Sequence, residues 1–268
     1  MENLLEVKNL QFSFRTYGGV VKAVRDVSFE VRPGEILGIV GESGCGKSVT
    51  SLSLMHLVQS PPGKIVDGEI LMDGRDLLKL SKSEMEHVNG KDVAMIFQEP
   101  MTSLNPVLKV GHQIMESILF HTDATKEEAR AKALEMIKLV GIPRAEEIME
   151  CYPHELSGGM RQRVGIAMAM TFNPELLLAD EPTSALDVTT QAQIVRQMME
   201  LRDDFHTGII IVTHNIGVAA YMADQLIVMQ NGKVVDQGTR DEVMNHPTSD
   251  YTKKLLAAVP EMEGRRFV

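Results

Sequence analysis

The sequence contains little cysteine, no tryptophan and no long apolar run. Its 268 residues include two cysteines, Cys45 and Cys151, and these do not form a CxxC pair. The opening segment MENLLEVKNL also lacks the basic region and the apolar run of a secretory signal. Because disulfides persist mainly in oxidising compartments, we expect a protein of the reducing cytoplasm.

The sequence also lacks a membrane span and an excess of positive charge. No apolar run approaches the roughly 20 residues that cross a bilayer as a helix, so any role at a membrane requires a partner that spans it. Lysine and arginine number 27 against 37 aspartates and glutamates, which gives a net charge of −10. This balance argues against a nucleic-acid-binding protein with a basic face, although it leaves a local basic patch possible.

The sequence does contain short apolar runs that alternate with helical patterns, which predicts an α/β fold. The candidate strands are LLEVKNLQFSF, VRDVSFEV, 35–41, 92–98, 175–181, 208–214 and the two halves of a hairpin at 225–238. Asn231-Gly232 in the last segment is typical of a type I′ hairpin turn. Between 99 and 173, helical spacing predicts a helical lobe inserted into the α/β core.

Residues 41–48, GESGCGKS, fit the pattern GxxxxGK[ST] between a predicted strand and a helical pattern. Glycines let several backbone N–H groups face one point, and the helix N-terminus adds partial positive charge. Lys47 would reach the β- and γ-phosphates of a nucleotide, and the Ser48 hydroxyl would bind Mg²⁺. Cys45 stands at a variable position of the pattern and receives no special role. The segment predicts a nucleotide-binding loop, against the plain alternative of a glycine-rich turn.

Polar side chains stand where three other predicted strands end. Asp180 ends the apolar run LLLAD and would complete the Mg²⁺ shell, while Glu181 would polarise the water that attacks the γ-phosphate. His214 and Gln98 end two further strands, where α/β sheets place ligands. His214 would hold the attacking water, and Gln98 would bind Mg²⁺ or that water. The plain alternatives are a pair of solvated loop acids before Pro182 and, for the histidine taken alone, a structural role.

A second segment with the features of an anion site, LSGGMRQR, occupies residues 156–163. Ser157 and the N–H groups of Gly158 and Gly159 would cap a helix that starts at Met160. If this segment and the phosphate loop cannot reach one ATP within a chain, they can do so between two chains arranged head to tail. ATP would then hold the chains together, and hydrolysis would release them. A plain helix cap is the alternative.

GESGCGKS, Gln98, LSGGMRQ, LLLADE, SALD (184–187) and His214 occur in the order and spacing of the ATP-binding cassette (ABC) ATPases, which the chain resembles over nearly its whole length. The resemblance implies a P-loop NTPase core with a mixed sheet, an N-terminal antiparallel β subdomain and an α-helical subdomain inserted at about 99–173. It implies an ABC ATPase domain at 1–245 and a short C-terminal tail at 246–268. The implied activity is ATP hydrolysis, with Mg²⁺, coupled to solute transport across a membrane.

The same resemblance implies catalytic and metal-binding roles for the matching residues. Glu181 would be the catalytic base and His214 the switch histidine, with Gln98 completing the catalytic set. Mg²⁺ would be bound by Ser48, Gln98 and Asp180. The SALD segment would cross a dimer interface and couple two sites.

Nucleotide contacts follow in the same way. Phe14 would stack on adenine, with Tyr17 as the second candidate. Asn215 follows the histidine where the family mostly has Asp, so the hydrogen bonding around it is expected to differ. The residues implied to contact ATP, in one chain or its partner, are Phe14, Gly41, Glu42, Ser43, Gly44, Cys45, Gly46, Lys47, Ser48, Val49, Ser157, Gly158, Gly159, Gln162 and Asp187.

Finer features resemble the importers of peptides, nickel and related small solutes, namely the segments 98–106, 152–163 and 246–260. Residues 63–86 and SGGM resemble the first of two distinct ATPase subunits. The implied partners are a related second ATPase chain, two transmembrane permease subunits and an external solute-binding protein, with a homodimer left open. The chain would lie on the cytoplasmic face of the cell membrane, and the segment after Gln98 would receive a coupling helix from a permease.

We therefore expect the ATP-hydrolysing subunit of a bacterial importer of di- or oligopeptides. Nickel or metallophore import is the alternative, because solute specificity lies in other subunits. A non-transport ABC ATPase of DNA repair or the ribosome would show a long coiled-coil insertion or two cassettes. In a kinase or GTPase that acts alone, the LSGG and SALD segments would have no function, which argues against this class. Long relatives carry a C-terminal cysteine cluster for an iron–sulfur centre; this sequence reaches Val268 without one, so the chain is short or truncated and no cluster is assumed.

Overall fold

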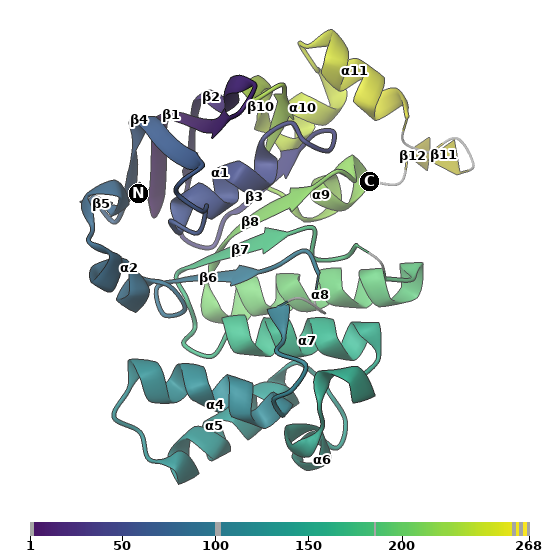
Figure 1. The fold of residues 1–268 in the computed structure, drawn as a ribbon. Helices are drawn as coiled ribbons and strands as arrows, with labels where there is room; N and C mark the ends of the chain where they lie inside the picture. The colour runs from purple at the N-terminus through teal and green to yellow at the C-terminus, as the bar shows by residue number, and fades with distance from the viewer. Residues whose placement is uncertain (1–2, 100–102, 185, 259–260, 263–264, 267–268) are drawn as a thin grey trace. The chain divides into compact units, whose positions relative to one another are not determined.

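The computed structural model describes residues 3–99, 103–184, 186–258, 261–262 and 265–266. The chain forms two compact units, the first made of residues 1–85 and 208–268 and the second of residues 86–207 (Figure 1). Segments near both ends of the chain therefore fold together, and the middle of the chain forms a unit of its own.

The first unit contains an antiparallel sheet from the N-terminal part of the chain, in the order β2-β1-β4-β5. Its strands are β1 Leu5–Thr16, β2 Gly19–Val31, β4 Gly63–Met72 and β5 Arg75–Asp76. Leu5 of β1 lies opposite Val31 of β2 on one side and Met72 of β4 on the other. Alternating apolar residues such as Leu5 and Val7 are buried, so one face of β1 joins the core. β4 was not among the predicted strands.

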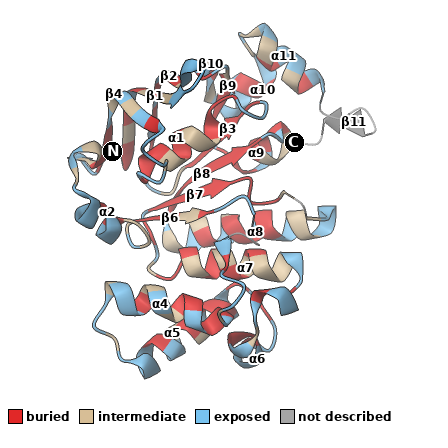
Figure 2. Ribbon diagram, in the orientation of Figure 1, coloured by how far each residue is buried: buried red, intermediate tan, exposed pale blue. Residues whose placement is uncertain are grey.

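The second sheet of the first unit has buried parallel strands at its centre. The strands that the first unit contributes are, in spatial order, β10 Lys233–Thr239, β9 Gln225–Gln230, β3 Ile36–Val40 and β8 Gly208–Thr213. β3 runs parallel to β8 and β9, and every residue of β3 and β8 is buried (Figure 2). β10 returns antiparallel to β9 through Asn231 and Gly232, whose φ angles of 50° and 78° confirm the predicted turn.

Short helices complete the first unit. They are α1 Lys47–Leu54, η1 Leu77–Lys79, α9 Ile216–Met222, α10 Arg240–Asn245 and α11 Asp250–Ala257. α9 packs on β3 and β8 through small residues, since Ala219 and Ala220 are fully buried. α2 Lys82–Val88 contains residues of both units, and β11 Glu261–Met262 pairs with β12 Arg265–Arg266 near the C-terminus.

The second unit consists of two parallel strands and a group of helices. These elements are β6 Val93–Ile96, α4 Val110–His121, α5 Lys126–Leu139, α6 Ala145–Glu150, η2 Pro153–Glu155, α7 Gly158–Ala169, β7 Leu176–Asp180 and α8 Val188–Phe205. α4, α5 and α7 pack on one another, with Ile114, Ile137 and Val164 fully buried. A capping box formed by Thr125 and Glu128 begins α5, as the sequence TKEE favours.

Candidate nucleotide-binding site

The phosphate loop connects β3 to α1 and is shaped by a glycine at the start of the helix. Gly46 precedes α1 with a φ of 109°, and a Cβ atom added there would lie 2.5 Å from the Ala23 carbonyl oxygen of β2. A side chain at this position is therefore excluded by both conformation and space. No side chain of the described residues caps α1, so the positive end of this helix faces the loop.

Lys47 lies inside the loop rather than in solvent. Its Nζ atom donates hydrogen bonds to the carbonyl oxygens of Gly41 at 2.7 Å and Glu42 at 2.9 Å, and the side chain is 6% exposed. A lysine is rarely this buried unless its charge is satisfied. The carbonyl oxygens of the loop thus hold the Lys47 ammonium group inside the phosphate loop. A lysine in a glycine-rich loop of this kind binds the phosphates of a nucleotide together with the backbone N–H groups.

His214 lies beside the phosphate loop at the same edge of the sheet. Val40 of β3 pairs with Thr213 of β8, so Gly41 and His214 both directly follow paired residues. Asn215 then caps α9, because its side chain accepts hydrogen bonds from the Gly217 and Val218 N–H groups at 3.0 and 3.3 Å. An Asn at this position thus satisfies the helix N-terminus as an Asp would.

The second unit places Gln98 and two acids at one edge of its strands. Ile96 of β6 pairs with Ala179 of β7. Gln98 therefore lies two residues beyond this pair, and Asp180 lies one residue beyond it. Asp180 and Glu181 are 5% and 8% exposed, and buried carboxylates normally require a cation or several donors. Carboxylate and amide oxygens are ligands suited to Mg²⁺, so the donors that the second unit presents fit the predicted metal.

Glu181 also adopts an unusual backbone conformation. Its φ is 48°, in the left-handed region, which costs a non-glycine residue about 1–2 kcal/mol. The Ser184 N–H and hydroxyl both donate to the Glu181 carbonyl at 3.1 Å and hold the turn. Strain of this kind clusters at functional sites, in keeping with the predicted catalytic role.

Ser157 caps α7, and its hydroxyl accepts a hydrogen bond from the Met160 N–H at 3.3 Å. The predicted cap is therefore confirmed, but the predicted helix start at Met160 was wrong, because α7 begins at Gly158. The two glycines form the first helical turn that the serine caps. Gln162 in the next turn is 2% exposed, and its Nε2 atom has no hydrogen-bond partner among the described residues.

Asp187 lies next to this helix tip. It caps α8 by accepting hydrogen bonds from the Thr190 hydroxyl at 2.7 Å and the Thr190 N–H at 3.0 Å, and both bonds lower the pKa of the Asp187 carboxyl. A Cβ atom at Gly159 would lie 2.7 Å from the Thr190 methyl group, so glycine permits the two helix tips to touch. The structure thus brings Ser157 to Gly159 together with Asp187. Ala185 of the SALD segment and residues 100–102 of the segment after Gln98 lie outside the described residues.

Phe14 lies on β1, opposite Val21 of β2. Val21 lies two residues before Ala23, whose carbonyl oxygen abuts Gly46. The Phe14 ring is half-buried, with its centroid 5.1 Å from that of Phe12. Tyr17, the second candidate, lies in the β1–β2 turn and is fully exposed. Of the two predicted candidates, Phe14 is thus the one that lies on a strand and packs against another ring.

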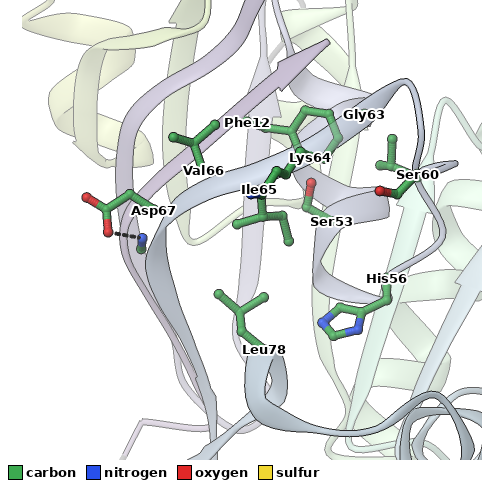
Figure 3. Close-up of a pocket in the computed structure, with 12 residues that line it drawn as sticks. Phe12, Ser53, His56, Ser60, Gly63, Lys64, Ile65, Val66, Asp67 and Leu78 are labelled. Atoms are coloured by element: carbon green, nitrogen blue, oxygen red, sulfur yellow. Dashed lines mark hydrogen bonds between the residues drawn. The ribbon is translucent and has the colours of Figure 1, made fainter. Parts of the chain in front are cut away.

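A separate cavity of about 530 Å³ lies in the first unit, among β1, β4, η1 and the end of α1 (Figure 3). Phe12, His56 and Leu78 contribute to its lining, and burial lowers the pKa of the His56 imidazole although the Asp76 carboxylate opposes the shift. None of its lining residues is a predicted site residue. The cavity is thus distinct from the nucleotide site.

One contact to the loop was missed from the sequence. The Glu42 N–H donates a hydrogen bond to the Tyr251 hydroxyl at 3.0 Å, which brings α11 onto the phosphate loop. The resemblance of residues 246–260 to importer tails was the only sequence signal near this contact, and it did not point to the loop.

Comparison with known proteins agrees with this geometry. Residues 24–184 match the protein family described as ABC transporter. The oligopeptide transport ATP-binding protein OppD of Bacillus subtilis (strain 168) is 54% identical over 97% of this chain and 73% of its own length. The dipeptide transport ATP-binding protein DppD of the same organism is 50% identical over 98% and 78%.

A solved structure gives the same result for the fold. The dimeric post-hydrolysis state of the ATP-binding cassette MJ0796, bound to ADP and Pi, matches with a TM-score of 0.78 and 28% identity over 88% of this chain and 98% of that one. The predicted fold class and the predicted resemblance are thereby confirmed. From its phosphate loop, its strand-end carboxylates, its LSGG helix tip and these relatives, the chain belongs to the ABC transporter family and carries the ATPase domain of that family.

Proposed function

We propose that this chain is the ATP-hydrolysing subunit of a bacterial importer of di- or oligopeptides. The observation that carries the proposal is the identity of 50–54% to two peptide-transport subunits, OppD and DppD, over nearly the whole chain. Nickel or metallophore import remains the alternative solute class. Specificity would reside in permease and binding-protein subunits, so the solute is the part of the proposal that most needs experiment.

Within the chain, we assign binding to the residues of the phosphate loop and chemistry to the strand ends. Lys47 neutralises the phosphates, and the loop N–H groups orient them. Glu181 accepts a proton from the attacking water, while His214 and Gln98 hold that water in line with the γ-phosphate. Mg²⁺, when bound through Ser48, Asp180 and Gln98, would neutralise developing charge on the phosphate oxygens.

We further propose that the Ser157 helix tip serves the ATP of a second chain. Ser157 and Gly158 are exposed, so a nucleotide presented by another molecule can approach them. The contact between the tips of α7 and α8 supports a coupled role for Asp187 at the same interface. We expect the second chain to be a related ATPase subunit, as the resemblance of residues 63–86 predicts.

The proposed membrane partners are two permease subunits, supplied with solute by an external binding protein. Among the residues that the structure describes, no helix is long and apolar enough to cross a bilayer. Attachment at the cytoplasmic face would therefore be through the permeases. Phe97, Val107 and Phe120 are exposed apolar side chains of the second unit, near Gln98 in sequence or on α4, and they offer contact area to a coupling helix.

We assign residues 1–245 to the ABC ATPase domain, with 99–173 as its helical subdomain and 246–268 as a C-terminal tail. The helices α4 to α7 lie within the helical assignment.

The proposal is tested by transport. The chain is assembled with the permease, ATPase and binding-protein subunits encoded beside it in vesicles that contain ATP, and uptake of labelled di- and oligopeptides and of nickel is measured. Peptide uptake that requires ATP is expected, and a matched assembly with Glu181→Gln should show none. Nickel uptake without peptide uptake would replace the solute class. ATPase activity independent of any permease or solute would favour a non-transport ABC ATPase.

A further inference from the structure

The C-terminal helix α11 touches the phosphate loop at a single peptide group. The Tyr251 hydroxyl accepts a hydrogen bond from the Glu42 N–H at 3.0 Å, across 209 residues of sequence. The carbonyl of the same peptide group belongs to Gly41, and it accepts a hydrogen bond from Lys47 Nζ at 2.7 Å. In a planar trans peptide the N–H and C=O groups point in opposite directions. One peptide group is thus held by Tyr251 on its outer side and by Lys47 on its inner side.

Tyr251 is itself held in place by a buried carboxylate. Asp236 of β10, 8% exposed, accepts hydrogen bonds from the Thr248 N–H at 3.0 Å, the Thr248 hydroxyl at 2.8 Å and the Ser249 N–H at 3.0 Å. Ser249 then caps α11 by accepting a hydrogen bond from the Tyr251 N–H at 3.2 Å. The backbone at Tyr251 is therefore tied to β10, and from this position its hydroxyl reaches the Glu42 N–H.

We propose that Tyr251 is a positioning residue for nucleotide binding, which orients the Gly41–Glu42 peptide and thereby Lys47. The inference rests on the proposed function in assigning the nucleotide to residues 41–49. It adds a residue outside the loop, and it links the position of the C-terminal helix to the affinity for ATP. Displacement of α11 would free the peptide to rotate and would leave the Lys47 ammonium without one of its two carbonyl acceptors.

The substitution Tyr251→Phe removes the hydroxyl and keeps the ring. Because one hydrogen bond is lost, we expect the Kd for ATP to rise about three- to tenfold. The KM for ATP should rise by a similar factor with little change in kcat, because the bond acts on binding before and during the reaction. Hydrogen exchange of the Glu42 amide should become faster. Tyr221→Phe, on an exposed tyrosine of α9, is the matched control and should change none of these.

A double-mutant cycle tests the geometry directly. Glu42→Pro removes the N–H donor, so adding Tyr251→Phe to this variant should have no further effect on the Kd for ATP. A further loss of the same size would show that the hydroxyl acts elsewhere and would overturn the inference. An unchanged Kd and unchanged exchange in Tyr251→Phe alone would overturn it as well, whether or not the proline variant folds.

A third variant separates this inference from the proposed function. Lys47→Ala should abolish ATP binding if the loop holds the nucleotide. Normal ATP binding in Lys47→Ala would contradict the proposed function itself. Loss of binding in Lys47→Ala together with a Kd in Tyr251→Phe equal to that of Tyr221→Phe would contradict only the role of Tyr251.

Discussion

The phosphate loop and the LSGG helix tip both present backbone N–H groups, but they are supported in different ways. The loop is braced by distant parts of the chain: Ala23 of β2 abuts Gly46, the Gly232 N–H donates to the Cys45 carbonyl at 2.8 Å, and Tyr251 accepts from Glu42. The helix tip is supported by its own first turn and by two neighbouring elements: the Met160 N–H donates to the Ser157 hydroxyl, Arg161 donates to the Pro153 carbonyl, and Gly159 abuts Thr190 of α8.

The phosphate loop is therefore a preformed binding site, whereas the helix tip supplies only one side of a site. A loop held by three separate elements keeps its shape with or without a ligand, because each contact removes freedom from the backbone. The exposed helix tip offers backbone N–H donors, but it does not surround a ligand on several sides. Substitutions at the loop should therefore alter ATP binding by the single chain, whereas substitutions at the tip should alter ATP binding and hydrolysis only in the assembled complex.

The largest expected effect is a loss of ATP turnover, and it comes from Glu181, which lies outside both the phosphate loop and the LSGG helix tip. Glu181→Gln should lower ATP hydrolysis by the assembled complex about 100-fold or more, because an amide cannot accept the proton of the attacking water. ATP binding should persist, since the charge of Lys47 and the loop are unchanged. Steady-state phosphate release and nucleotide binding are measured together. Turnover at the rate of the unmodified complex would remove Glu181 from the role of base.

A pair of glycine substitutions tests the comparison most directly. Gly46→Ala should destabilise the chain by about 2–4 kcal/mol and weaken ATP binding, because the new Cβ would lie 2.5 Å from the Ala23 oxygen and the φ of 109° would be strained. Gly158→Ala would meet only the Leu186 methyl group at 3.5 Å, and alanine favours helices.

We expect Gly158→Ala to leave the free energy of unfolding within about 0.5 kcal/mol of its original value while ATPase activity of the assembled complex falls. Urea unfolding and ATPase assays on both variants provide the measurement. Equal losses of stability in the two variants would mean that the tip is braced as strongly as the loop.

Acidification should weaken the support that α11 gives to the loop. Burial raises the pKa of Asp236, but hydrogen bonds from Ser249 and Thr248 outweigh it and hold the pKa below the usual value of about 3.9. The ionised form therefore favours the folded state, and its contribution is complete above the ordinary pKa. It is lost as the pH falls through the lowered value.

Asp236→Asn should reduce stability at pH 7 by about 1–3 kcal/mol and flatten its dependence on acid pH. Unfolding free energies measured from pH 7 to pH 3 give the test. An identical acid dependence in the variant would assign the effect to other carboxylates.

The smallest expected effect concerns the cap of α7. Ser157→Ala should cost the single chain about 1 kcal/mol, because the Met160 N–H loses its acceptor. Ser157→Thr keeps the hydroxyl and serves as the control. If nucleotide affinity of the isolated chain fell with Ser157→Ala, the tip would bind ATP within its own chain rather than across an interface.

Local sequence features predicted where the candidate site residues lie in the fold, because local chemistry determines loops and strand ends. The phosphate loop requires glycines at defined spacing, and apolar runs that end in Asp180, His214 or Gln98 mark strand ends directly. The start of α7 was placed two residues late, because Gly158 and Gly159 have low helix propensity while the Ser157 cap brings them into the first turn.

Contacts between distant segments could not be predicted in this way. The segment that forms β4 mixes Lys64, Asp67 and Glu69 with apolar residues, so its strand character depends on pairing with β1. Asp236 and Tyr251 are ordinary surface residue types in sequence. Their roles arise because β10 and the C-terminal segment fold against each other and the loop, which no local pattern records.

The contact between Gly159 and Thr190 has a mechanical consequence. Since a Cβ atom at Gly159 would lie 2.7 Å from the Thr190 methyl group, the first turns of α7 and α8 are in direct contact with little free space between them. A neighbouring molecule that displaced the first turn of α8 toward α7 would therefore press on the turn that Ser157 caps.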